Sequence, residues 1–166
     1  MKRACISGIV FLLLAGCAAV DGRNIKVGAS TAQDVEVQMG LPAEKLKAID
    51  GDTIYFYPHQ PFGRQMYAVR IAPQGVVRSV EQVLTEENLR KMVPGSTTRT
   101  QAREVFGPPY MVSANSRMER EVWQYYVWNQ QQWEFFLFLQ YSPDGVLREA
   151  YMLKDYNKEM GDSFGR

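Results

Sequence analysis

The sequence predicts an α+β fold built from two tandem units that together form a two-layer sheet with short helices on one face. Each unit is expected to contain a helix, an irregular link and a three-stranded antiparallel meander. Three observations support this fold class. A helix-start phrase occurs twice, a Pro-x-Gly-Val turn recurs at nearly the same spacing, and each turn lies among segments rich in β-branched and aromatic residues.

The helix-start phrase carries the same structural residues in both copies. These are Gly28, Thr31, Gly40 and Pro42 in the first copy, and Gly95, Thr98, Gly107 and Pro109 in the second. Each Thr stands three residues before a side chain that can accept a hydrogen bond, which is the spacing of a capping box. The later Gly suits a left-handed residue at the helix end, and the Pro stops the helix. Each copy therefore predicts a helix of about two turns.

The rest of each unit is expected to be mostly strand. In the first unit, residues 43–49 are predicted as a helical turn, followed by strands at 53–57, 66–72 and 76–83. In the second unit, a helix at 85–92 precedes the phrase, residues 108–119 are predicted as an irregular link, and strands follow at 120–128, 133–141 and 146–153. These elements place the first unit at 27–84, the second at 85–154 and a loose polar tail at 155–166.

The first residues resemble a bacterial lipoprotein signal. A basic start and a short apolar run lead into Leu14-Ala15-Gly16-Cys17, and the run is too short to span a bilayer. The resemblance implies that residues 1–16 are removed, that Cys17 is lipidated, and that residues 17–26 form a tether. Because Ala18 follows the Cys, it also implies sorting to the periplasmic face of the outer membrane. An ordinary signal peptide with an accidental Cys17 is the alternative.

Little in the sequence indicates catalysis or metal binding. The net charge of +1 becomes −1 once Lys2 and Arg3 leave with the signal, so nucleic acid is not an expected partner. His59 is the single histidine, and we expect no metal and no cofactor beyond the lipid. The carboxylate pairs Glu86-Glu87 and Glu119/Glu121 are interpreted as charges at the start of a helix and at the edge of a strand, respectively, and not as catalytic pairs. With no catalytic motif present, we predict that the chain is not an enzyme and name no catalytic residue.

The aromatic residues of the second unit suggest a binding surface instead. Alternation along 133–141 places Phe135, Leu137, Leu139 and Tyr141 on one face, which we predict to be core. Trp123, Tyr125 and Val127 join that face if the turn at 129–132 has the right parity. The candidate partner-binding residues are then Tyr126, Trp128, Phe136 and Phe138 on the opposite face, with Phe62 in the Pro58–Arg64 loop. The alternative is that both faces are buried between the units.

Taken together, the motifs resemble the SmpA/OmlA (BamE-type) outer-membrane lipoprotein domain, here as a tandem copy resembling the fold of the β-lactamase-inhibitor proteins. The resemblance is carried by the repeated Gly-x-(Ser/Thr)-Thr and Gly-x-Pro motifs, by Trp123-Gln124-Tyr125 and by Pro143-Asp144-Gly145-Val146. It implies protein–protein binding, accessory to outer-membrane β-barrel assembly or envelope integrity, with the barrel-assembly machine as partner. An inhibitor or sequestering module for a periplasmic enzyme is the alternative.

Overall fold

The computed structural model describes residues 21–59, 63–128 and 134–154 of the chain. The predictions for the signal at 1–16, for Cys17, for Phe62 and for the tail at 155–166 lie outside these residues. The side chain of Trp128 is likewise outside the description.

The described residues form two four-stranded antiparallel sheets, each with its strands in chain order. The first unit consists of α1 (Ala32–Met39), β1 (Glu44–Lys47), β2 (Thr53–Pro58), β3 (Met66–Ile71) and β4 (Val77–Gln82). The second consists of α2 (Glu86–Leu89), α3 (Arg99–Phe106), β5 (Met111–Asn115), β6 (Arg120–Trp128), β7 (Glu134–Tyr141) and β8 (Leu147–Lys154). We refer to β1–β4 as sheet 1 and to β5–β8 as sheet 2.

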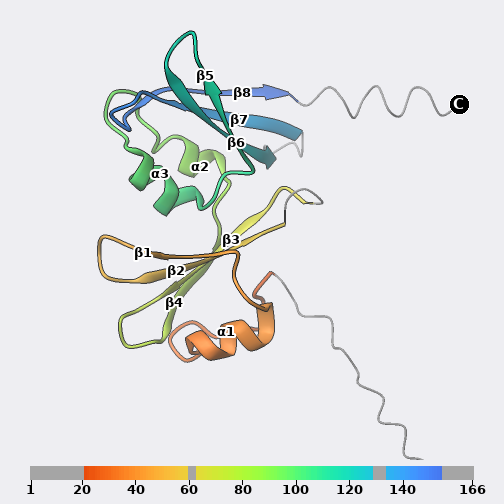
Figure 1. The fold of residues 1–166 in the computed structure, drawn as a ribbon. Helices are drawn as coiled ribbons and strands as arrows, with labels where there is room; N and C mark the ends of the chain where they lie inside the picture. Colours follow the sequence, from red (N-terminus) through yellow and green to blue (C-terminus); the bar gives the residue numbers. More distant parts are fainter. Residues whose placement is uncertain (1–20, 60–62, 129–133, 155–166) are drawn as a thin grey trace, which may run out of the picture.

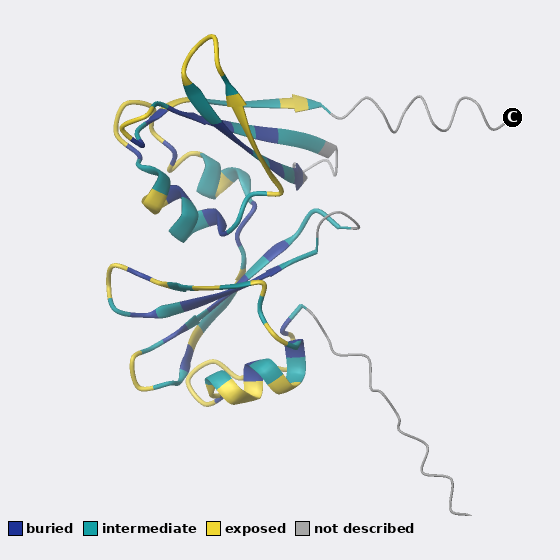
Figure 2. Cartoon of the chain, viewed as in Figure 1, coloured by how far each residue is buried: buried dark blue, intermediate teal, exposed yellow. Residues whose placement is uncertain are grey.

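The elements stack in four layers: α1, sheet 1, the helices α2 and α3, and sheet 2 (Figure 1). Val35 and Met39 of α1 pack on one face of sheet 1, in a cluster with Tyr57 and Val69. A second, larger cluster lies between the sheets, and it combines Phe106 of α3 with buried side chains of both sheets. Sheet 1 is therefore covered on both faces, as the mostly buried strands β2 and β3 show (Figure 2).

The predicted fold class was wrong in three respects. Each sheet has four strands rather than three, the two sheets are separate, and the helices α2 and α3 lie between the sheets rather than on one face of a joined sheet. The extra strands are β1, where we expected a helical turn, and β5, where we expected an irregular link. Both pair along their length with the strand that follows, and this pairing overrides the weak local strand propensity of their residues.

The predicted helix caps are present. Thr31 and Thr98 are the N-caps of α1 and α3, and both form a complete capping box with the residue three positions later. Gly40 and Gly107 end these helices with positive φ, at 83° and 72°. Their ψ angles of −171° and −160° place them in an extended region rather than the expected left-handed helical one. That region is open almost only to glycine.

The two units repeat the same local hydrogen bonds at corresponding residues. The N–H groups of Gly28 and Gly95 donate to the carbonyls of Val77 and Leu147, and the Val77 and Leu147 N–H groups return bonds to Ser30 and Thr97. The Tyr57 and Tyr125 hydroxyls donate to the carbonyls of the helix-ending Gly40 and Gly107, at 3.1 and 3.0 Å. β3 and β7 each show a register shift near their last residue. The repeated phrase thus fixes its helix to the last strand of its own unit.

Candidate interaction surface

The register of sheet 2 separates its two faces clearly. Trp123 lies opposite Leu139, and Tyr125 opposite Leu137, on the face that packs on α3. These four side chains are at most 7% exposed, and Val127 and Tyr141 are buried with them. The prediction that Leu137, Leu139 and Tyr141 belong to the core face is confirmed, and the register places Trp123, Tyr125 and Val127 on that face, which the sequence had left open. Phe135, also predicted for this face, is only partly buried.

The opposite face of sheet 2 carries a continuous row of aromatic side chains, which we call the aromatic ladder. It consists of Tyr110, Tyr126, Phe136, Phe138 and Tyr151, and so begins just before β5 and crosses β6, β7 and β8. Neighbouring rings have centroids 4.6 Å apart for Tyr110–Tyr126, 4.5 Å for Tyr126–Phe136, 6.2 Å for Phe136–Phe138 and 5.2 Å for Phe138–Tyr151. These separations are typical of favourable aromatic pairs.

The ladder retains contact with solvent. Tyr110 is 39% exposed, its other four members are half-buried, and Leu153 beside Phe136 is 53% exposed. The guanidinium of Arg64, from the β2–β3 connection of the first unit, lies 4.1 Å from the centre of the Tyr126 ring. The helices α2 and α3 pack on the core face of sheet 2, and on the ladder face the first unit contributes this contact of Arg64 with Tyr126.

Three of the five predicted partner-binding residues, Tyr126, Phe136 and Phe138, are therefore brought together. Trp128 pairs with Glu134 in the backbone register, and its side chain lies outside the described part of the chain. Sequence reasoning missed Tyr110 and Tyr151. The alternation of Tyr151 with neighbours in β8 could have indicated its face, whereas Tyr110 follows two prolines and gave no periodic signal.

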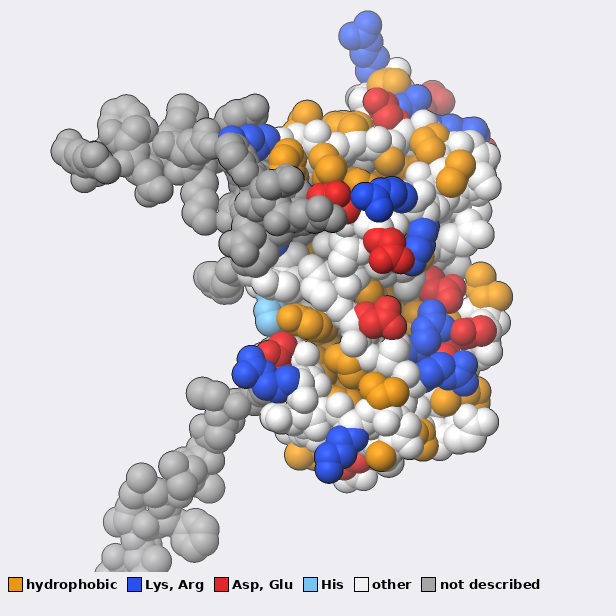
Figure 3. All heavy atoms as spheres, turned by 180° about the vertical axis from the view of Figure 1, so that it is seen from behind, with side chains coloured by type: hydrophobic (Ala, Val, Ile, Leu, Met, Phe, Trp, Pro, Cys, Tyr) orange, Lys and Arg blue, Asp and Glu red, His pale blue; other side chains and the backbone are white. Residues whose placement is uncertain are grey.

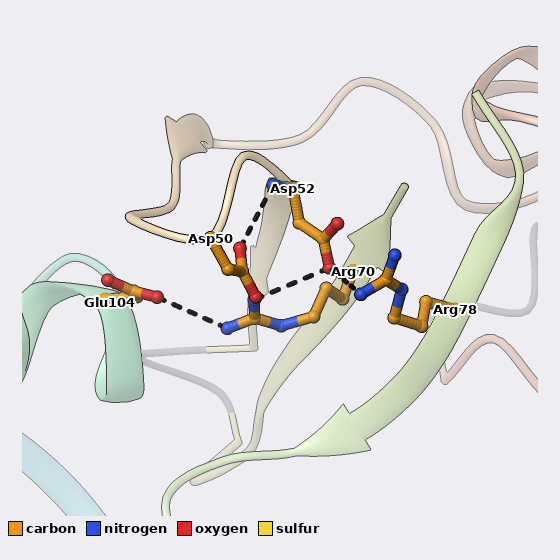
Figure 4. Close-up of polar contacts among 5 residues, drawn as sticks. All are labelled: Asp50, Asp52, Arg70, Arg78 and Glu104. Carbon is orange, nitrogen blue, oxygen red and sulfur yellow. Dashed lines mark hydrogen bonds and ion pairs between the residues drawn. The ribbon is translucent and has the colours of Figure 1, made fainter. Parts of the chain in front are cut away.

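A network of charged side chains joins the two units beside α3. Arg70 of β3 donates to Asp50 at 2.7 Å and to Glu104 of α3 at 3.4 Å (Figure 4). Asp52, whose side chain is 1% exposed, lies 3.6 Å from Arg70 and 3.3 Å from Arg78. A buried carboxylate needs such nearby positive charge to offset the loss of its hydration. We interpret this group as a structural ion network between sheet 1 and α3.

A hollow of about 360 Å³ opens beside this network, between sheet 1 and the helices α2 and α3. The charged residues that line it are two bases, Arg70 and Lys91, and two acids, Glu81 and Glu104. Arg70 and Glu104 pair with each other at 3.4 Å, and the two bases and two acids leave this lining without a net charge.

Two other residues singled out for possible chemistry, Glu121 and His59, have structural contacts. Glu121 accepts hydrogen bonds from Arg99 at 3.1 Å and from the Trp123 indole at 2.6 Å. His59 is half-buried, with its ring centroid 5.3 Å from that of Tyr67. Among the described residues, no group of three or more His, Cys, Asp or Glu side chains could hold a metal ion.

The surface seen in Figure 3 interleaves acidic and basic side chains, with apolar side chains between them. No large area of one charge sign stands out on this face. Within the described ranges, no helix combines the length and apolar character needed to cross a membrane.

Comparison with models of known protein families finds no match, and neither does comparison with curated proteins. Among solved structures, the chain is similar to a DUF4309 family protein (YjgB) from Bacillus subtilis, at 15% sequence identity and a TM-score of 0.32. The similarity covers 80% of this chain and 84% of that one.

Proposed function

We propose that this protein is a lipid-anchored protein of the outer membrane that binds a protein partner through the aromatic ladder of sheet 2. The ladder is the observation that carries the proposal. Exposed surfaces rich in Tyr and Phe are typical of protein interfaces, since such rings bury much apolar area at little entropic cost. The five rings also hold one another in place, so the surface is ordered before a partner arrives.

The anchor in this proposal is a lipid on Cys17, inferred from the lipoprotein-like signal. The tether places the folded units at the periplasmic face of the membrane. The role follows from the resemblance to the BamE-type domain: accessory work in β-barrel assembly or envelope integrity, with the barrel-assembly machine as partner. We propose no catalytic activity, metal or cofactor beyond the lipid.

Co-purification tests this proposal. The lipidated protein is isolated from detergent-solubilised outer membranes as wild type, as Phe136→Ala/Phe138→Ala, and as the control Val37→Ala/Ile49→Ala. Val37 and Ile49 are 77% and 78% exposed in the first unit, so the control removes exposed apolar side chains away from the ladder. Thermal melting of each variant establishes that it is folded.

We expect the barrel-assembly machine with the wild type and the control, and its loss with the ladder variant. Recovery of a soluble periplasmic enzyme, lost with the same variant, would favour the inhibitor alternative. Recovery of one partner equally with all three proteins would refute the ladder as the binding surface.

A further inference from the structure

The free edge of sheet 2 at β5 differs from the other three sheet edges of the described chain. The edge strands are β1 and β4 in sheet 1, and β5 and β8 in sheet 2. An exposed edge strand offers unpaired backbone N–H and C=O groups to another strand, and proteins commonly protect such edges with charged side chains or with covering segments.

The other three edges are protected in these ways. β1 reads Glu-Lys-Leu-Lys, and its first two residues pair with Arg103 and Glu36. β4 and β8 carry charged residues of both signs, and their starts are covered by the segments that precede α1 and α3. That covering is visible in the hydrogen bonds from Gly28 to Val77 and from Gly95 to Leu147.

Among the described residues, nothing gives β5 either protection. Its sequence, Met-Val-Ser-Ala-Asn, contains no charge, no proline and no glycine. Met111 is 49% and Val112 55% exposed, and the hairpin that contains β5 stands out from the body of the second unit (Figure 2). An uncharged, projecting edge strand with exposed apolar side chains is suited to pair with another strand.

We propose that the occupant of this edge is a second copy of the chain, with the two β5 strands pairing antiparallel about a two-fold axis. The strand is suited to face itself because self-pairing opposes no like charges. Antiparallel pairing that uses all of β5 must centre on Ser113, its middle residue. Val112 of each copy then lies opposite Ala114 of the other, and Met111 opposite Asn115.

The surroundings of β5 accommodate this pairing. A hollow of about 540 Å³ runs beside the strand, lined by residues 112–116 together with Arg99, Glu121 and Pro143. By register, Val112 and Ala114 share the sheet face of Trp123 and Glu121. In an added copy, Val112 and Ala114 lie on the same face of the joined sheet. The exposed Val112 of each copy therefore gains Ala114 of the other copy as an apolar neighbour. The joined sheet has eight strands and carries both aromatic ladders on one side.

Disulfide cross-linking tests the pairing and its register. The full-length chain with Cys5→Ser and Cys17→Ser has no other cysteine, so Ser113→Cys supplies one thiol. Residues opposite each other in antiparallel strands have Cα atoms about 4.5–5.5 Å apart, within reach of a disulfide. We expect Ser113→Cys to form a covalent dimer on mild oxidation in detergent, and the control Val37→Cys, on the exposed face of α1, to stay monomeric.

Mixing the two single variants Met111→Cys and Asn115→Cys should give a covalent heterodimer, whereas neither alone should cross-link. Cross-linking of Val37→Cys as readily as Ser113→Cys would overturn the proposal.

Sedimentation equilibrium provides a measurement without a cross-link. Val112→Lys places a charge at the edge of each copy, and we expect it to weaken self-association by about tenfold or more. The matched control is Val27→Lys, at a site 59% exposed in the first unit, which should associate like the parent chain. A parent chain that remains monomeric at every concentration, or dimers unaffected by Val112→Lys, would contradict the pairing. Phe136→Ala/Phe138→Ala should lose the partner and still dimerise, so this proposal and the proposed function can fail separately.

Discussion

The close approach of Gly107 to sheet 1 gives a sharp prediction for Gly107→Ala. Gly107 ends α3 directly against Phe56, which is fully buried in β2. A Cβ at Gly107 would lie 2.5 Å from Phe56 Cδ1 and 2.8 Å from Cγ, distances that require Phe56 or the end of α3 to move. The added methyl group therefore tests whether α3 is packed on sheet 1.

The matched control is Gly40→Ala. Gly40 has nearly the same backbone conformation at the end of α1, but a Cβ there would meet nothing within 4 Å. Both substitutions incur the backbone strain of a glycine-only conformation, about 1–3 kcal/mol. Gly107→Ala additionally overpacks a buried contact, which costs about 1–3 kcal/mol more.

Urea denaturation of the two variants and the wild type measures this difference in the free energy of unfolding. We expect Gly107→Ala to lose more stability than Gly40→Ala by the overpacking contribution. Combining Gly107→Ala with Phe56→Leu should recover part of the loss, while Gly40→Ala and Phe56→Leu should be additive. Equal losses at the two glycines, or no coupling between Gly107 and Phe56, would refute the packing of α3 on sheet 1.

Three further predictions concern the unit interface, alkaline stability and the anchor. Arg103→Met removes the Arg103 hydrogen bonds to the half-buried Glu44, one of them 3.0 Å long. The free energy of unfolding measured in urea should fall by about 1–3 kcal/mol. An unchanged midpoint would mean that this contact adds no stability. Burial raises the pKa of Tyr57 from 10.0 to about 12, so the Tyr57 hydroxyl ionises at lower pH in the unfolded chain than in the folded one. The free energy of unfolding should therefore fall as pH rises between these values, and Tyr57→Phe should reduce that fall. An unaltered pH dependence in Tyr57→Phe would contradict this role of Tyr57. Cys17→Ser should release the protein from the membrane fraction, and unchanged attachment would exclude the lipid anchor.

The sequence was informative wherever a local rule acts on few residues. Thr31 and Thr98 predicted their helices because a capping box is complete within four residues. The two faces of β7 followed from strict alternation, since one face is core and the other is not. These features depend on neighbouring residues, and the structure confirms them.

The features that depend on distant contacts could not be predicted in this way. β1 reads Glu-Lys-Leu-Lys, a composition that favours helix, and it is a strand because it pairs with β2. β5 shows no alternation because its first four residues are exposed on both faces. The helix α3 lies between two sheets because Gly107, Arg103 and Glu104 contact residues of the first unit. The sequence of an eight-residue helix does not indicate such distant contacts.

The aromatic ladder is the part of the candidate surface that the sequence located best. Its central rings were predicted from alternation, whereas Tyr110 and the Arg64 contact depend on how the chain folds back on itself. Arg64 comes from the other unit, so its place over Tyr126 could be known only from the packing of the two units.

Site-specific photo-cross-linking in intact cells tests the central claim most directly. A photoreactive amino acid replaces Phe138 in the ladder or, as the control, the exposed Val37 of α1 in the full-length protein. We expect light to join position 138, and not position 37, to one discrete protein partner that mass spectrometry identifies. A discrete partner captured from position 37 with none from position 138 would contradict the assignment of the aromatic ladder as the binding surface.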